Sequence, residues 1–220
     1  MWISRRAGGE AFEHIRGECS FFGRSFRVSE DVLIPRPETE LMVEAALELD
    51  LRAGSRVLDV GCGSGCLGVT MKAERENLEV VAVDLSMPAL EIAHANARNH
   101  RCRIHFLRGN LSTALGASFD LVLANLPYLP SSWIEGLPVE VQREPRMALD
   151  GGRDGLDLVR ILMEDLPRIL RPGAAVFVEL AEGQAGVVEE MGRDLGYQNP
   201  DRIRDAGGCA RILSFRWSRP

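Results

Sequence analysis

Residues 57–65 read V-L-D-V-G-C-G-S-G, a short apolar run followed by three glycines at alternate positions. The apolar run predicts a buried strand, and the glycines permit a sharp turn into a helix that should continue to about residue 72. A second apolar run over residues 80–83 ends at Asp84. A strand, a helix and another strand in this order indicate a parallel sheet that binds ligands at the carboxyl ends of its strands.

The same alternation continues along the chain. Upstream, the pattern predicts a helix that starts at Pro37 and a short hairpin around Gly23. Alternation of this kind is typical of an α/β, Rossmann-like, doubly wound sheet with helices on both faces. Further strands are expected at 104–107, 120–124, 175–179 and 211–217, and further helices at about 88–99, 156–170 and 184–195.

The composition excludes several classes of protein. Lys and Arg number 26 and Asp and Glu number 32, so the net charge is −6 and no bulk basic field would recruit nucleic acid. No stretch approaches the ~20 apolar residues that span a bilayer, and the N-terminus lacks the apolar segment of a signal peptide. Five cysteines at irregular spacing make a poor disulfide framework. We therefore predict a reduced, cytoplasmic protein with no membrane partner.

Two groups of cysteine and histidine residues are candidate zinc ligands by residue type. Cys62 and Cys66 are four residues apart in the glycine loop, and His100, Cys102 and His105 lie close together further on. Neither spacing matches a standard zinc site, so we predict no metal.

The glycine loop and Asp84 together indicate a ligand that contains a nucleoside. A carboxylate at the end of the second strand can accept hydrogen bonds from both hydroxyls of a ribose. Residues 63–68 match G-x-G-x-x-G, which would suggest NAD. Residues 59–65 also fit D-x-G-x-G-x-G, the form found in loops that bind S-adenosylmethionine. Asp59 would be poorly placed beside a pyrophosphate, so the sequence favours S-adenosylmethionine over NAD and over a plain turn.

Residues 125–128 read N-L-P-Y and follow the fourth expected strand, so they should face the ligand held by the glycine loop. This segment suits recognition of a planar NH₂ group, because the side-chain oxygen of Asn125 and the backbone carbonyl of Leu126 can each accept one of its protons. Pro127 would stiffen the turn, and Tyr128 could pack against the flat face of the group. The chemistry indicated is methylation of an amide or an exocyclic amine.

With these motifs, the chain resembles the HemK/PrmC group of class I S-adenosylmethionine-dependent methyltransferases. These enzymes methylate the side-chain nitrogen of the glutamine in the Gly-Gly-Gln motif of peptide chain release factors. The resemblance covers nearly the whole chain. It rests on I-P-R-P-E-T-E at 34–40, the glycine loop, V-D-L-S at 83–86, N-L-P-Y at 125–128, E-P at 144–145, A-L-D-G-G-R-D-G-L at 148–156 and the stretch 179–184.

The resemblance implies a fold and a division of the chain. The expected sheet has seven strands, mostly parallel with one antiparallel strand near the C-terminus. Residues 32–220 would form the S-adenosylmethionine-dependent methyltransferase domain. Residues 1–31 would be the remnant of an N-terminal domain or a linker, including the hairpin.

The resemblance also implies roles for individual residues. Asn125, Leu126, Pro127 and Tyr128 would bind the substrate amide, Asn125 and Tyr128 would act in catalysis, and Arg36 would border the site. The glycine loop would hold the methionine part of the cofactor, Asp84 its ribose, and Asn110 and Leu111 its adenine. The residues expected at S-adenosylmethionine, and at its product S-adenosylhomocysteine, are Asp59, Gly61, Cys62, Gly63, Ser64, Gly65, Asp84, Leu85, Asn110, Leu111 and Asn125. The partner would be a class I release factor, and the enzyme a monomer.

Three features depart from the family pattern. Leu126 stands where the family usually has proline, although its carbonyl remains. Since N-L-P-Y also occurs in adenine N6 methyltransferases of ribosomal RNA, methylation of adenine in RNA or DNA stays an alternative, as does a glutamine of another protein such as a ribosomal protein. Asn110 replaces the usual aspartate, and its amide oxygen can still accept from the adenine amine. The family's N-terminal helical domain is nearly absent, so we expect a short variant or a truncated chain.

Overall fold

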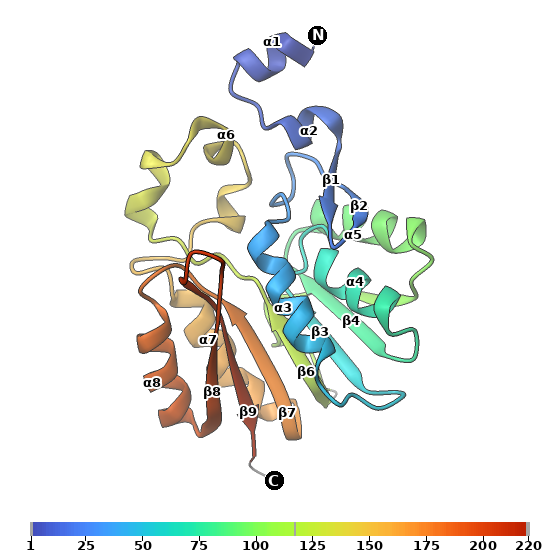
Figure 1. Ribbon diagram of the computed structural model, residues 1–220, viewed down its shortest axis with the longest axis vertical. Coiled ribbons are helices and arrows are strands. Elements are labelled where there is room, and N and C mark those ends of the chain that lie inside the picture. The colour runs from blue at the N-terminus through green and yellow to red at the C-terminus, as the bar shows by residue number, and fades with distance from the viewer. Residues whose placement is uncertain (1, 117, 219–220) are drawn as a thin grey trace.

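The computed structural model describes residues 2–116 and 118–218. Within these residues, one sheet of seven strands has the order β5-β4-β3-β6-β7-β9-β8 (Figure 1). The strands are β3 (Arg56–Val60), β4 (Glu79–Asp84), β5 (Ile104–Arg108), β6 (Phe119–Ala124), β7 (Leu170–Glu179), β8 (Tyr197–Arg204) and β9 (Ala210–Trp217). β9 runs antiparallel to both of its neighbours and the other pairs are parallel, so the predicted sheet with one antiparallel strand is confirmed.

Helices cover both faces of the sheet, as expected for a doubly wound fold. Successive residues of a strand point to opposite faces, so Leu58 of β3 packs with α7 and α8 whereas Val57 packs with α3, α4 and α5. The two faces therefore bury separate apolar cores. The helices are α3 (Pro37–Leu47), α4 (Cys66–Glu74), α5 (Met87–Asn99), α7 (Asp157–Asp165) and α8 (Ala185–Leu195).

The N-terminal segment contains more structure than its sequence predicted. The hairpin around Gly23 is confirmed as β1 (Glu18–Phe21) paired with β2 (Arg24–Arg27). Two short helices precede it, α1 (Trp2–Ala7) and α2 (Phe12–Arg16), where weak periodicity predicted none. α1 buries no residue, so its sequence carries no apolar stripe by which it could be recognised.

Two further elements were missed in the C-terminal half. β8 contains Pro200, and most of its residues are exposed, so it lacks an apolar pattern. Between the strand expected at 120–124 and the helix expected at 156–170, the chain contains the short helix α6 (Val139–Gln142), flanked by the 3₁₀ turns η1 (Ser131–Gly136) and η2 (Arg146–Ala148). A third turn, η3 (Leu166–Arg168), follows α7. In Figure 1 the segment around α6 lies beside the N-terminal helices, above the carboxyl ends of the parallel strands.

Neither a membrane-spanning helix nor a metal-binding cluster is found among the described residues. No helix there is long and apolar enough to cross a membrane. Nor do three or more of the His, Cys, Asp and Glu side chains described gather as a metal site would require.

Candidate functional site

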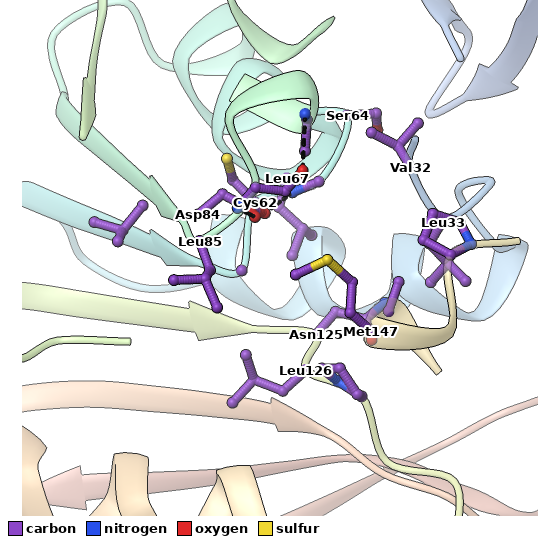
Figure 2. A pocket seen from close by; sticks show the side chains of 18 of the residues that line it. Val32, Leu33, Cys62, Ser64, Leu67, Asp84, Leu85, Asn125, Leu126 and Met147 are labelled. Carbon is purple, nitrogen blue, oxygen red and sulfur yellow. Dashed lines mark hydrogen bonds between the residues drawn. The ribbon is translucent and has the colours of Figure 1, made fainter. Parts of the chain in front are cut away.

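A cavity lies at the carboxyl ends of β3, β4 and β6, where the strand order of the sheet reverses. This is the position at which open parallel sheets bind ligands. In Figure 2 Asp84 and Leu85 lie toward one side of the cavity and Asn125 and Leu126 toward another, with Met147 reaching in between. The predicted residues that line it are Gly61, Cys62, Gly63, Ser64, Asp84, Leu85, Asn110, Leu111, Asn125, Leu126 and Pro127.

The glycine loop has a backbone conformation that explains its composition. Gly61, Gly63 and Gly65 have φ values of 67°, 52° and 78°, in the left-handed region that other residues rarely adopt. A Cβ on Gly61 would also lie 2.9 Å from the Leu126 side chain, which lines the cavity. The loop therefore makes the sharp turn into α4 that the alternate glycines predicted, with Gly61 and Gly63 along the cavity.

Asp84 holds the glycine loop in place and keeps capacity for a ligand. Its Oδ2 accepts a hydrogen bond from the Gly63 N–H and its Oδ1 accepts one from the Ser86 N–H, each at 2.8 Å. A carboxylate has about four acceptor positions, so about two remain for groups inside the cavity. This is the capacity that two ribose hydroxyls would need.

Two predicted cofactor residues, Asp59 and Gly65, do not line the cavity. Asp59 is 1% exposed and lies behind the glycine loop, where its Oδ2 accepts from the Gly68 N–H at 2.8 Å. Burial raises the pKa of this carboxyl to about 7. Its Oδ1 has no partner among the described residues. Asp59 thus ties the strand to the first turn of α4, and a direct role at the cofactor stays a prediction.

The N-L-P-Y segment presents one unpaired acceptor next to the cavity. The Nδ2 of Asn125 donates to Thr39 Oγ1 at 3.1 Å. Its Oδ1 is buried and has no partner among the described residues. A buried polar atom without a partner is costly, which makes this oxygen a candidate to bind a ligand. Leu126 is 2% exposed and its side chain contributes to the cavity wall.

Tyr128 and Arg36 lie beside a second recess rather than in the first cavity. Leu33 and Ala148 line both hollows, so the two adjoin. The Tyr128 hydroxyl donates to Glu179 Oε1 at 3.2 Å, and burial raises the pKa of the phenol. The Tyr128 hydroxyl is therefore used in a partly buried hydrogen bond, and the residue lines the recess.

The buried carboxylate of Glu144 anchors Arg36. Glu144 is 3% exposed, and its two oxygens accept from the Arg36 guanidinium and from the Ile34 N–H. These contacts hold the segment around η2 over the I-P-R-P stretch, more than a hundred residues away in sequence. The E-P and I-P-R-P motifs, which the sequence could not connect, are therefore in contact; Pro35 and Pro145 line the cavity and Arg36 lines the recess.

The D-G-G-R-D-G segment at 150–155 supports the backbone of N-L-P-Y. Leu129 and Asp150 form a parallel bridge, and the Gly151 N–H donates to the Leu129 carbonyl at 2.9 Å. Gly155 has a φ of +80°, and a Cβ on it would lie 2.1 Å from the Tyr128 carbonyl oxygen. Because the two backbones are this close, only glycine fits at 155.

Gln184 completes this support from the start of α8. Its Nε2 donates to the Tyr128 carbonyl at 2.8 Å and to the Asp154 carbonyl at 3.1 Å. Its Oε1 accepts from the Ala181 N–H at 2.8 Å. One buried amide therefore joins three segments that the resemblance had singled out separately.

No role was predicted for three polar residues that the structure buries at the site. They are Thr39, Glu144 and Glu179, exposed by 1%, 3% and 2%. Burial raises the pKa of Glu179 to about 7, while the neighbouring Thr39 and Tyr128 hydroxyls oppose this shift. All three lie in segments that carry the family resemblance. Polar residues without an assigned role inside those motifs could therefore have been predicted as site residues.

The chain is similar to known methyltransferases. The family model described as "Methyltransferase small domain" matches residues 37–133. The release factor glutamine methyltransferase of Geobacter sulfurreducens is 40% identical over 216 residues, which are 97% of this chain and 76% of that protein.

Solved structures of lower sequence identity share the fold. A methyltransferase from Pyrococcus furiosus has a TM-score of 0.66 at 20% identity and covers 99% of this chain and 98% of its own. The hMettl16 catalytic domain in complex with MAT2A 3'UTR hairpin 6 has a TM-score of 0.72 at 18% identity, covering 90% of this chain and 76% of its own.

Proposed function

Because the chain belongs to the family of release factor glutamine methyltransferases, we propose that it transfers a methyl group from S-adenosylmethionine to the side-chain amide nitrogen of a glutamine in a class I peptide chain release factor. The acceptor would be the glutamine of the Gly-Gly-Gln motif. The observation that carries the proposal is the buried, unpaired Oδ1 of Asn125, a residue that lines the same cavity as the glycine loop.

The residues that line the cavity suit S-adenosylmethionine. Asp84 keeps acceptor positions for the ribose hydroxyls, and the glycine loop leaves room for a ligand close to its backbone. Leu85 and Leu111 supply apolar surface for a flat base, with Asn110 beside them as a hydrogen-bonding partner for its amine. When bound, this cofactor supplies an electrophilic methyl group carried on a positively charged sulfur.

The chain's own residues would orient the acceptor nitrogen. Asn125 Oδ1 and the Leu126 carbonyl would each accept one amide N–H, which fixes the plane of the amide. Both acceptors are partially negative, so they stabilise the positive charge that develops on the nitrogen as it is alkylated. Because the amide nitrogen becomes a strong acid only then, its proton can leave to water after the transfer.

No general base is needed at the nitrogen before the transfer. Among the described residues that line the cavity, carboxylates are carried only by Asp31 and Asp84. Asp84 is held by the glycine loop, and Glu179 lines neither the cavity nor the recess. The site is arranged to orient the acceptor rather than to deprotonate it.

A protein substrate is better supported than a nucleic acid. Relatives of high identity carry the name of a glutamine methyltransferase, whereas the likeness to an RNA-bound domain is at 18% identity and concerns the fold alone. The net charge of −6 also provides no general attraction to a polyanion. A cytoplasmic location and a monomeric state remain predictions that go with a release factor as substrate.

A methyl-transfer assay with radiolabelled cofactor tests this proposal. The acceptors offered side by side would be a class I release factor, its Gly-Gly-Ala variant and ribosomal RNA. We expect label in the release factor only. Label in RNA, or label that persists in the Gly-Gly-Ala protein, would refute the proposed acceptor.

A further inference from the structure

The orientation of the Asn125 side chain decides whether the site can bind an amide. The two ends of a side-chain amide are nearly equal in size, so packing alone does not choose between them and hydrogen bonds must. In the structure Nδ2 points to Thr39 Oγ1 at 3.1 Å, which leaves Oδ1 free. In the opposite orientation an NH₂ group would face the NH₂ group of the substrate, and two donors cannot pair.

Thr39 accepts from Asn125 only if its own proton is used elsewhere. Thr39 lies in the first turn of α3 and is 1% exposed, so water does not readily take that proton. Glu179 at the end of β7 lies close enough for the Thr39 hydroxyl to lower the pKa of its carboxyl. In its ionised form this carboxyl can only accept, so it favours the hydroxyl orientation that leaves a lone pair for Asn125 Nδ2.

Glu179 also holds the other end of the N-L-P-Y segment. Its Oε1 accepts from the Tyr128 hydroxyl at 3.2 Å. The charged groups around it are Glu38 of α3, which raises the pKa of its carboxyl, and Arg211 of β9, which lowers it. One buried carboxyl therefore bonds to the Tyr128 hydroxyl and lies near the Thr39 hydroxyl that contacts Asn125.

We propose that Thr39 is a positioning residue, which fixes the Asn125 amide with its oxygen toward the acceptor nitrogen. The contact that carries this inference is the hydrogen bond from Asn125 Nδ2 to Thr39 Oγ1 at 3.1 Å, which leaves Oδ1 without a partner among the described residues. The inference rests on the proposed amide methylation, since only an acceptor with two N–H groups requires this orientation.

Two variants test the proposal through kcat for methyl transfer to the release factor. Thr39→Val keeps the size of the side chain and removes the acceptor, so kcat should fall at least about tenfold. Thr39→Ser keeps the hydroxyl and should stay within about threefold of wild type. For both, the Kd for S-adenosylhomocysteine should stay within about threefold of wild type.

A second readout does not depend on the acceptor. The Asn125 side-chain NH₂ signal can be assigned by NMR from its absence in Asn125→Ala. Its hydrogen exchange should be slow in the wild type and in Thr39→Ser and faster in Thr39→Val, since only the last lacks the partner for Nδ2.

The outcomes separate this inference from the proposed function. If the wild type does not methylate the release factor, the function is wrong, and the exchange rates still decide the orientation. Unchanged kcat and exchange in Thr39→Val would overturn the positioning role. An equal loss of kcat in Thr39→Ser and Thr39→Val would overturn it as well, because packing rather than the hydroxyl would then matter.

Discussion

Replacement of Asp84 by alanine should greatly weaken the binding of S-adenosylhomocysteine. The carboxylate already accepts from the N–H groups of Gly63 and Ser86, both at 2.8 Å, so it is held rigidly before any ligand arrives. Two acceptor positions remain for the ribose hydroxyls. Hydrogen bonds to a charged group contribute about 1.5–3 kcal/mol each. Loss of two corresponds to about 3–6 kcal/mol, or roughly 10²–10⁴-fold in Kd.

Asparagine is not a conservative replacement at this position. An amide has one acceptor oxygen, so its NH₂ would face either the Gly63 or the Ser86 N–H and repel it. We therefore expect Asp84→Asn to weaken S-adenosylhomocysteine as well. Ser86→Ala is the matched control, because it removes only the side-chain cap of α5, 3.3 Å from the Ala89 N–H. That variant should lose about 1 kcal/mol of stability and keep its affinity.

The assay is calorimetric titration in a double-mutant cycle that pairs the protein variant with the ligand. The ligands are S-adenosylhomocysteine and its 2′-deoxy analogue. If Asp84 binds the ribose, the missing hydroxyl weakens binding to the wild type and has little further effect on Asp84→Ala. Equal losses in both proteins, or an affinity of Asp84→Ala within about threefold of wild type, would refute the ribose assignment.

Three other variants test separate parts of the site. Asn125→Ala should lower turnover about 10²–10³-fold, with S-adenosylhomocysteine affinity nearly unchanged; near-normal turnover would leave N-L-P-Y as only a turn. The raised pKa of Asp59 means that the folded state binds more protons than the unfolded one between about pH 4 and 7, so stability falls as pH rises through this window. Asp59→Asn should remove that fall and be more stable at pH 8 by up to roughly 4 kcal/mol in urea unfolding, whereas identical pH profiles would contradict the assigned burial. Gly155→Ala would bring a Cβ to within 2.1 Å of the Tyr128 carbonyl oxygen, so turnover should fall with cofactor affinity retained, and normal turnover would show that the loop does not support the site.

Much of the fold was predictable because its signals are local. The apolar runs of β3 and β4 and the glycines after β3 lie within about thirty residues of one another, and they fixed the strand–helix–strand unit and the place of the cavity. β8 and α1 were missed for the opposite reason. Their residues are largely exposed, so no apolar period marks them.

The site was less predictable where it depends on distant contacts. Thr39 meets Asn125 across 86 positions, and Tyr128 meets Glu179 across 51. Nothing in the local sequence specifies these pairs, although each residue stands inside a motif that the resemblance had singled out. For Asp59, the D-x-G-x-G-x-G pattern predicted a contact with the ligand. In the structure its carboxyl group lies behind the loop and accepts a hydrogen bond from the Gly68 N–H.

Tandem mass spectrometry of a class I release factor, after incubation with this protein and S-adenosylmethionine, shows whether Asn125 and Leu126 orient a glutamine amide for methylation. We predict a single added methyl group, located on the side-chain nitrogen of the Gly-Gly-Gln glutamine and absent when the Asn125→Ala protein is used. A methyl group on another residue, or an equal yield with Asn125→Ala, would contradict the claim.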